Sequence, residues 1–570
     1  MRTMHAGPLV AGYENGFLRR IRYGDTEVIR MIYFALRDRN WNTLESRIEN
    51  EKISAGDNRF LITYDCINLS EGLPIMEWKV KLEGTPEGVI IFEVNGTMLE
   101  TFQKNRAGFC ILHPLNVAGR NCTLTHPDGN ESVHAFPVAI SPINPFLQIQ
   151  AMTWDADATT FHLEFEGDTF ETEDQRNWGD ASYKTFCTPL DKPFPAELKK
   201  GESVYQKITF RPVAPLQPLT DTERPITLRS TTIKTTLPLL GICASTQVKQ
   251  LSEKAIANIR ALRLSYYRIE VHPASETWVT DFSDAYETAY ALGIGLEVVL
   301  HLTQNYKEEI EAFSVLCQQN KVRLKKVLLL DAYGMVTGKK IIAEVPALKR
   351  IFPRVLFGAG TNYNFNEINK NHFAPEEIDF ISLSFDPQEH AFDDLTILEN
   401  VGTLPHVVHS TKAIYGGGMP VHLSPITLRK RFNPYATNPS DLFIPEARKA
   451  DPRQTEVFCA VWTFGTILGL TRGGAHSTTF FQTVGNQGIL SSDGDPYPVY
   501  KVLKQFAPFQ GKSVTVLDSS DPIAVEGMVI NDKVLALVNY ATHESMVRWD
   551  NLDFKLEPYE MRFVPLNRPQ

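Results

Sequence analysis

The chain has 570 residues, of which 43% are hydrophobic and 22% charged, and its formal net charge is −10. This length exceeds what a single hydrophobic core supports, so we expect several domains. A negatively charged chain is not attracted to nucleic acid or to an anionic membrane surface, which excludes both as default partners.

The seven cysteines are scattered along the chain and form no CxxC pair. This pattern predicts reduced, buried thiols rather than a disulfide framework. The first residues do not have the pattern of a signal peptide, and the sequence contains no run of 18 apolar residues. We therefore expect a cytoplasmic protein with no membrane partner.

The first 228 residues consist of short strand-like runs separated by Gly, Asn, Asp and Pro. The run at 160–166 alternates apolar and polar residues, as a half-exposed strand does. Many strands with few helical patterns predict an N-terminal antiparallel β-sandwich domain over residues 1–228.

Alternating strand and helix patterns follow from residue 229 to 490. Eight strand-like runs lie at 239–243, 266–271, 296–301, 327–331, 355–358, 380–384, 420–424 and 478–482. Eight strands, most of them separated by helical patterns, predict a (β/α)8 TIM barrel. Strands without helices return over 491–570, which predicts a small C-terminal β-sandwich domain. The predicted fold class is thus α/β plus all-β.

The segment 358–371 follows the fifth predicted barrel strand and places Asn362 and Asn366 close to the carboxylate of Glu367. Polar side chains after a barrel strand usually face a substrate pocket. Glu367 also fits the first turn of a short helix. Glu297 lies within an apolar strand, so it is either paired with a neighbouring Arg or Asn or functional.

Several histidines follow or lie on barrel strands. His390 lies in a polar loop, and His422 lies on the seventh strand, where a satisfied core histidine is the competing interpretation. His301, His390 and His422, with Asp386, are the residues that could ligate a metal. Because the sequence has no HExxH, HxH or CxxC pair, we predict no metal and no cofactor.

The segment 171–186 concentrates acidic, amide, guanidinium and indole side chains without periodicity. It either reaches the barrel mouth and binds a polar molecule there, through Gln175 and Arg176, or only joins two domains.

Five segments, 106–114, 173–190, 360–369, 387–393 and 421–428, resemble the D-apionate lactonase family. The resemblance extends over the whole chain and implies a TIM barrel between two β domains. It also implies hydrolysis of D-apionolactone to D-apionate in the bacterial breakdown of apiose, with a small-molecule sugar lactone as the partner. It supplies no catalytic residues.

Opening a lactone requires a base that activates water, donors that stabilise the oxyanion, and an acid that protonates the ring oxygen. We predict Glu297 and Glu367 as the acid and base, in either order. The predicted oxyanion donors are Arg268, Asn366, His390 and His422. The predicted contacts to substrate hydroxyls are Asn362, Gln388, Gln175 and Arg176.

Two other functions stay open. Asn366 and Glu367 look like the acid/base pair of many barrel glycosidases, which need a second carboxyl group such as Glu297 or Glu270. The seventh strand, however, carries His422 rather than a nucleophilic Glu. The other alternative is a non-catalytic carbohydrate-binding protein. The sequence leaves the oligomeric state open.

Overall fold

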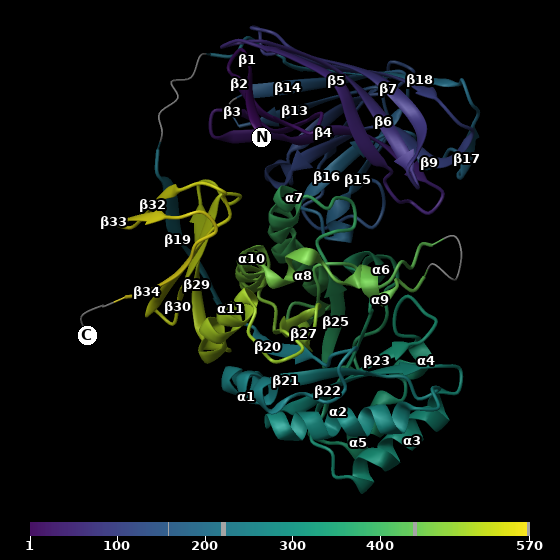
Figure 1. The fold of residues 1–570 in the computed structure, drawn as a ribbon, viewed down its shortest axis with the longest axis vertical. Helices are drawn as coiled ribbons and strands as arrows, with labels where there is room; N and C mark the ends of the chain where they lie inside the picture. Colours follow the sequence, from purple (N-terminus) through teal and green to yellow (C-terminus); the bar gives the residue numbers. More distant parts are fainter. Residues whose placement is uncertain (158, 218–223, 437–441, 567–570) are drawn as a thin grey trace. The chain divides into compact units, whose positions relative to one another are not determined.

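The computed structural model describes residues 1–157, 159–217, 224–436 and 442–566 (Figure 1). These residues form two compact units. One contains residues 1–176, 181–217 and 435–436, and the other contains residues 177–180, 224–434 and 442–566.

The first unit is built from two nine-stranded antiparallel sheets. The first sheet contains β1 (Arg2–Ala6), β2 (Leu9–Glu14), β3 (Phe17–Tyr23), β4 (Thr26–Asp38), β9 (Phe102–Pro114), β16 (Ser182–Phe186), β15 (Phe170–Asp174) and β12 (Phe146–Ile149), with β17 (Ala196–Leu198) beside β9. The second contains β11 (Glu131–Ala135), β10 (Asn121–Thr125), β13 (Ala151–Ala156), β14 (Thr159–Glu166), β18 (Ser203–Pro212), β8 (Ile90–Met98), β7 (Leu73–Gly84), β6 (Phe60–Ser70) and β5 (Glu45–Ala55).

Alternation of side chains along these strands gives the two sheets one shared core. Buried and exposed positions alternate in β6 and β8, as expected when one face of a sheet packs inward. Aromatic rings from both sheets meet in this core: Phe34 lies 5.2 Å from Trp78, and Phe92 lies 5.0 Å from Phe109, between ring centroids. The predicted N-terminal sandwich is confirmed.

The second unit contains a closed parallel barrel of eight strands. These are β20 (Leu239–Cys243), β21 (Tyr266–Val271), β22 (Gly295–Leu302), β23 (Leu324–Asp331), β24 (Leu356–Gly360), β25 (Phe380–Phe385), β26 (Val421–Ile426) and β27 (Ser477–Val484). Parallel pairing of β20 with β27 closes the barrel, and the short β28 (Gly488–Leu490) lies beside β27. The predicted TIM barrel is confirmed.

Helices follow most barrel strands. They are α1 (Glu253–Leu262), α2 (Trp278–Leu292), α3 (Tyr306–Gln319), α4 (Lys339–Ile342), α5 (Val345–Ile351), α6 (Phe365–Lys370), α7 (Asp394–Glu399), α8 (Leu404–Tyr415), α9 (Glu446–Lys449), α10 (Val457–Gly473) and α11 (Pro498–Phe506). Nearly every residue of α10 is buried, because it packs against α8, α11 and the C-terminal sheet. No helix among the described residues has the length and hydropathy needed to cross a bilayer.

The C-terminal part is hydrogen-bonded as one seven-stranded sheet. Its strands, in order, are β33 (Leu552–Leu556), β32 (Ser545–Trp549), β19 (Ile226–Thr236), β29 (Ser513–Ser519), β30 (Val525–Ile530), β31 (Val534–Asn539) and β34 (Met561–Pro565). β19 precedes the barrel in sequence, yet it pairs antiparallel with β29 and parallel with β32. The predicted boundary between residues 228 and 229 therefore falls inside a strand of this sheet.

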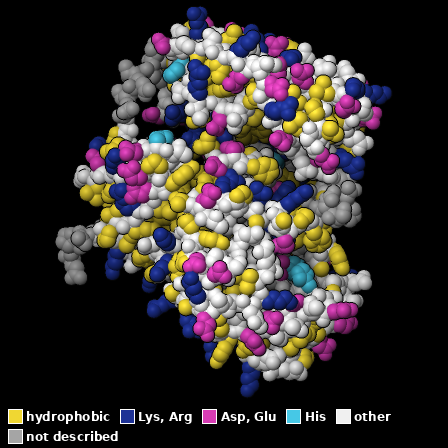
Figure 2. All heavy atoms as spheres, viewed as in Figure 1, with side chains coloured by type: hydrophobic (Ala, Val, Ile, Leu, Met, Phe, Trp, Pro, Cys, Tyr) yellow, Lys and Arg dark blue, Asp and Glu magenta, His cyan; other side chains and the backbone are white. Residues whose placement is uncertain are grey.

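All seven cysteines are free thiols, and six of them are buried. Basic and acidic side chains are interspersed on the face of the molecule shown in Figure 2.

Candidate active site at the mouth of the barrel

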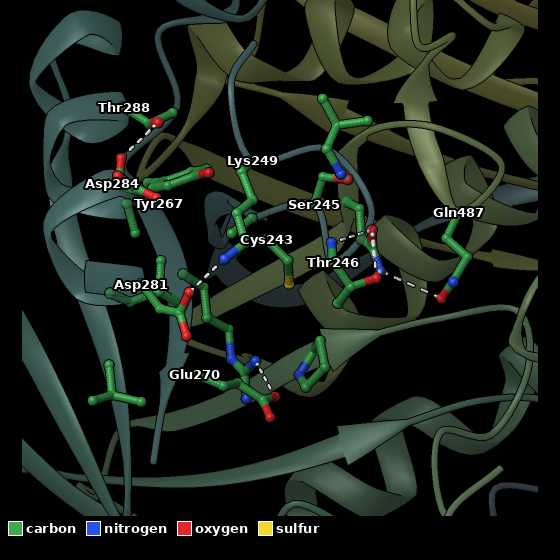
Figure 3. Close-up of a pocket in the computed structure, with 18 of the residues that line it drawn as sticks. Cys243, Ser245, Thr246, Lys249, Tyr267, Glu270, Asp281, Asp284, Thr288 and Gln487 are labelled. Atoms are coloured by element: carbon green, nitrogen blue, oxygen red, sulfur yellow. Dashed lines mark hydrogen bonds and ion pairs between the residues drawn. The ribbon is translucent and has the colours of Figure 1, made fainter. Parts of the chain in front are cut away.

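A cavity of about 470 Å³ opens at the carboxyl ends of the barrel strands. Its wall is formed by the ends of β20, β21, β26 and β27, by one side of α2, and by the segment after β26. Figure 3 shows Glu270 of β21 in this wall, and Lys249 paired with Asp281 at 2.7 Å. A cavity at this end of a TIM barrel, with charged side chains in its wall, is where such enzymes bind their substrates.

Glu270 is the central charged group of this cavity. Its Oε1 atom accepts hydrogen bonds from Arg268 Nη1 at 2.8 Å and from Arg431 Nη1 at 2.6 Å. Burial opposes the negative charge of Glu270, but Arg431 and Arg268 hold the pKa of its carboxyl group well below the usual range. Glu270 is therefore an ionised carboxylate at neutral pH.

Asn362 connects the same two arginines from the end of β24. Its Oδ1 accepts hydrogen bonds from Arg268 Nη2, at 3.3 Å, and from Arg431 Nη2. Within the described residues, neither Asn362 Nδ2 nor Arg268 Nε has a hydrogen-bond partner, although both are buried. Leaving buried donors unpaired is costly, so these two N–H groups indicate a place where a ligand accepts hydrogen bonds.

Two histidines lie beside Glu270. Val271 of β21 pairs with Leu300 of β22, and this register places His272 next to His301. Their rings stack with centroids 4.1 Å apart, and His301 Nε2 lies 3.3 Å from Glu270 Oε2. Burial and the neighbouring His301 lower the pKa of His272, which favours a neutral imidazole at neutral pH.

Glu297 is fully buried inside the barrel and is paired. Its carboxylate lies 3.1 Å from Lys326 Nζ and accepts hydrogen bonds from Ser424 Oγ at 3.0 Å and Thr479 Oγ1 at 3.4 Å. Arg268 Nε is 3.7 Å away, which joins this interior group to the cavity. These surroundings match the paired interpretation of Glu297, and a catalytic role for it stays a prediction.

His422 belongs to the same interior group. Its Nδ1 accepts a hydrogen bond from Lys326 Nζ at 3.0 Å, and its ring stacks on Phe380 with centroids 4.2 Å apart. Burial, together with Lys326, holds the pKa of His422 well below its usual range. Because His422 is the second residue of β26, it lies toward the amino end of the strand.

Glu367 and Asn366 lie in the first turn of α6, where both are buried. Asn366 Nδ2 donates a hydrogen bond to Glu367 Oε1 at 3.0 Å. Asn364 occupies the N-cap position but makes no capping bond, and its Nδ2 donates a hydrogen bond to Glu389. Glu367 is thus both a first-turn helix residue and a buried carboxyl group near β24, and its catalytic role stays a prediction.

Part of the segment 171–186 belongs to the barrel unit. His390 Nδ1 lies 2.6 Å from Asp180 Oδ2, and Asn369 Nδ2 donates to Asn177 Oδ1 at 2.8 Å. Residues 177–180 therefore contact α6, which follows β24, and the loop that follows β25.

The other predicted substrate contacts are already engaged. Arg176 pairs with Asp174 at 2.7 Å within the first unit, and Gln175 accepts a hydrogen bond there from Ser182. Gln388 donates to the Leu428 carbonyl and to Asp451. Roles for Gln175, Arg176 and Gln388 in binding substrate stay predictions.

The fold and the charged cavity define a TIM-barrel enzyme. The chain matches the family model described as "D-apionate lactonase, N-terminal domain" over residues 1–214, and the model of the TIM-barrel domain of the same family over residues 240–511. The chain belongs to the D-apionate lactonase family and is a hydrolase that acts on the ester bond of a lactone.

A curated relative, the D-apionate lactonase of Brucella anthropi, is 28% identical over 547 residues, which cover 91% of this chain and 89% of the relative. Among solved structures, a β-arabinopyranosidase is 10% identical with a TM-score of 0.34 and covers 99% of this chain and 96% of its own. The α-L-arabinofuranosidase AbfB of Bifidobacterium longum is 10% identical with a TM-score of 0.43, over 60% of this chain and 95% of its own.

The cluster around Glu270 was only partly predictable. Arg268 and Glu270 lie two residues apart on one face of β21, and His272 continues this spacing just past the strand end, which is the signal in the sequence for this cluster. The contribution of Arg431 carries no such signal, because it comes from a segment without periodicity.

Proposed function

We propose that this protein hydrolyses D-apionolactone to D-apionate, as a step in the bacterial breakdown of apiose. The observation that carries the proposal is the hydrogen-bonded group of Glu270, Arg268 and Arg431 in the wall of the cavity, with Asn362 bonded to both arginines. Supporting it is similarity over most of the chain to a protein named D-apionate lactonase.

The donors in this group suit the transition state of ester hydrolysis. Attack of water on the lactone carbonyl places negative charge on the carbonyl oxygen. Arg268 Nε and Asn362 Nδ2 are buried N–H groups with no hydrogen-bond partner among the described residues, and Arg268 Nε lies 3.7 Å from Glu297 Oε1. We assign them to the developing oxyanion, with the positive charge of Arg431 nearby.

Protonation of the departing ring oxygen requires an acid, and we propose for this step Glu367, a buried carboxyl group that the sequence predicts as either the acid or the base. Glu297, the other member of the acid/base pair predicted from the sequence, is the alternative. Glu270 is a weak base, because its two arginine partners lower its pKa. Its proposed role is to hold Arg268 and Arg431 in place.

Product analysis tests the reaction. The purified protein is incubated with D-apionolactone and, separately, with aryl glycosides, and release of acid and of aryl alcohol is followed. We expect acid from the lactone alone. Release of aryl alcohol would instead support a glycosidase, and no reaction with either substrate would support a binding protein.

Variants test the site. Glu270→Gln is expected to lower kcat/KM by about 100-fold or more, the range for losing oxyanion stabilisation. The matched control is Glu308→Gln, which alters an exposed residue on α3 and is expected to keep wild-type activity. Full activity in Glu270→Gln would place the reaction elsewhere in the molecule.

A further inference from the structure

Three side chains with metal-ligating atoms converge at the edge of the cavity. One ligand atom from each of Glu270, His272 and His301 lies within 4.8 Å of the other two. Glu270 lies in β21, His272 directly follows the last residue of β21, and His301 lies near the end of the adjacent β22. Two of the three ligands are thus held by neighbouring strands of the barrel, and the third adjoins one of them.

The ligand atoms of this set are not used up by other contacts. The two arginines bind Glu270 Oε1, and Oε2 faces His301. His301 Nε2 forms no hydrogen bond of good geometry with a described residue and faces Glu270 Oε2, a member of the same set, at 3.3 Å, although the His301 side chain is only 10% exposed. A cation between these two atoms would satisfy both of them.

We propose that Glu270, His272 and His301 bind one divalent transition-metal cation. Two imidazoles and one carboxylate form the donor set that suits Zn²⁺, Mn²⁺ or Fe²⁺, whereas Mg²⁺ and Ca²⁺ prefer oxygen ligands alone. Three protein ligands leave coordination positions open for water or substrate. His272 is exposed, so the ion enters from the cavity side.

The two arginines affect this site in opposite ways. Their positive charges repel a cation and lower its affinity. Their hydrogen bonds to Oε1 also fix the Glu270 carboxylate, and such contacts to a ligating carboxylate are a regular part of metal sites. The imidazole nitrogens, which prefer transition metals, then decide which cation binds.

The role of the ion rests on the proposed function, but its binding does not. A bound transition metal lowers the pKa of a coordinated water, to about 7 for zinc in known hydrolases. Activation of water is the step for which Glu270, as a weak base, is unsuited.

Calorimetry without any lactone tests the site. The protein is treated with a chelator, dialysed and titrated separately with ZnCl₂ and MnCl₂. We expect one site per chain for at least one of these ions. His272→Asn and His301→Asn are each expected to weaken binding by about tenfold or more. The control, His543→Asn, removes an exposed imidazole in the C-terminal sheet region and is expected to leave binding unchanged.

Two outcomes overturn the proposal. One is that neither ion binds stoichiometrically to the wild-type protein, and the other is that both His272→Asn and His301→Asn bind with wild-type affinity. Circular dichroism at 222 nm is expected to show that both variants are folded. If one of them is unfolded, Glu270→Gln takes its place, with the same expectation of weakened binding.

Activity assays separate this proposal from the proposed function. Metal binding without lactone hydrolysis would support the metal site and contradict the proposed lactone substrate. Full lactone hydrolysis by chelator-treated protein that binds neither ion would contradict the metal site and support the proposed lactonase activity.

Discussion

Replacing Glu297 with Gln distinguishes a structural carboxylate from a catalytic one. In the structure Glu297 is fully buried and lies 3.1 Å from Lys326 Nζ. The variant keeps the size and shape of the side chain but removes its charge, so Lys326 loses its carboxylate partner inside the barrel. We expect the main effect to be on the free energy of unfolding.

The expected loss of unfolding free energy depends on the hydrogen bonds that Lys326 keeps in the variant. Removing one partner of a buried ion pair typically costs about 3–5 kcal/mol. Lys326 still donates hydrogen bonds to His422 Nδ1 and Ser477 Oγ, so we expect the lower end, about 3 kcal/mol. Burial already lowers the pKa of Lys326, despite the opposing effect of Glu297. Release of its proton in the variant would limit the cost further.

Urea denaturation followed at 222 nm measures this cost, because all the described α-helices belong to the barrel unit. A double-mutant cycle with Lys326→Met isolates the pair, and we expect a coupling energy of about 2–3 kcal/mol. The reasoning is refuted if Glu297→Gln unfolds at the wild-type urea concentration while kcat falls tenfold or more. Glu297 would then be the acid or base that the sequence predicts.

Three further predictions concern other parts of the molecule. Burial lowers the pKa of His113 to about 3. Above the unfolded pKa of about 6.5 the imidazole is neutral in both states, and as pH falls toward 3 only the unfolded chain binds the proton, so the folded state loses stability. Between pH 6.5 and 5 the loss is about 2 kcal/mol, so His113→Gln should flatten the pH dependence of unfolding there, and an unchanged slope would contradict this. Gly360→Ala would place a Cβ 1.8 Å from the Ser382 carbonyl oxygen, and we expect little soluble protein; wild-type yield and melting temperature would contradict the clash. Asp180→Asn weakens the contact with His390, and protease cleavage between residues 177 and 180 should become faster, whereas cleavage at the wild-type rate would show that the contact does not hold this segment.

The fold could be predicted from the sequence because the spacing of apolar residues indicates where strands and helices lie. Each of the eight predicted barrel strands overlaps an observed one, since apolar runs separated by helical patterns leave few other arrangements. The pairing of β19 with strands near the C-terminus could not be predicted, because about 280 residues lie between them and periodicity carries no information on partners.

The site was harder to predict because burial and pairing are properties of the folded chain. Glu297 was singled out as a carboxylate in an apolar strand, and the sequence did not reveal that Lys326, three positions into β23, lies beside it. The sequence also did not reveal that Arg431 extends back to Glu270. Both partners are set by strand register and by an irregular segment.

Arg268 connects the two groups of charges, and this connection explains why the barrel tolerates charge in its interior. Its Nη1 binds Glu270 at the cavity, and its Nε lies 3.7 Å from Glu297. Each carboxylate therefore has a cation on either side: Lys326 and Arg268 for Glu297, and Arg268 and Arg431 for Glu270. In a chain of alternating charges that is buried at Glu297, Lys326 and Arg268 and partly buried at Glu270 and Arg431, each member is stabilised only while the others are present. The position of Arg268 Nε, which we assign to the oxyanion, thus depends on Glu297, a fully buried carboxylate that does not line the cavity.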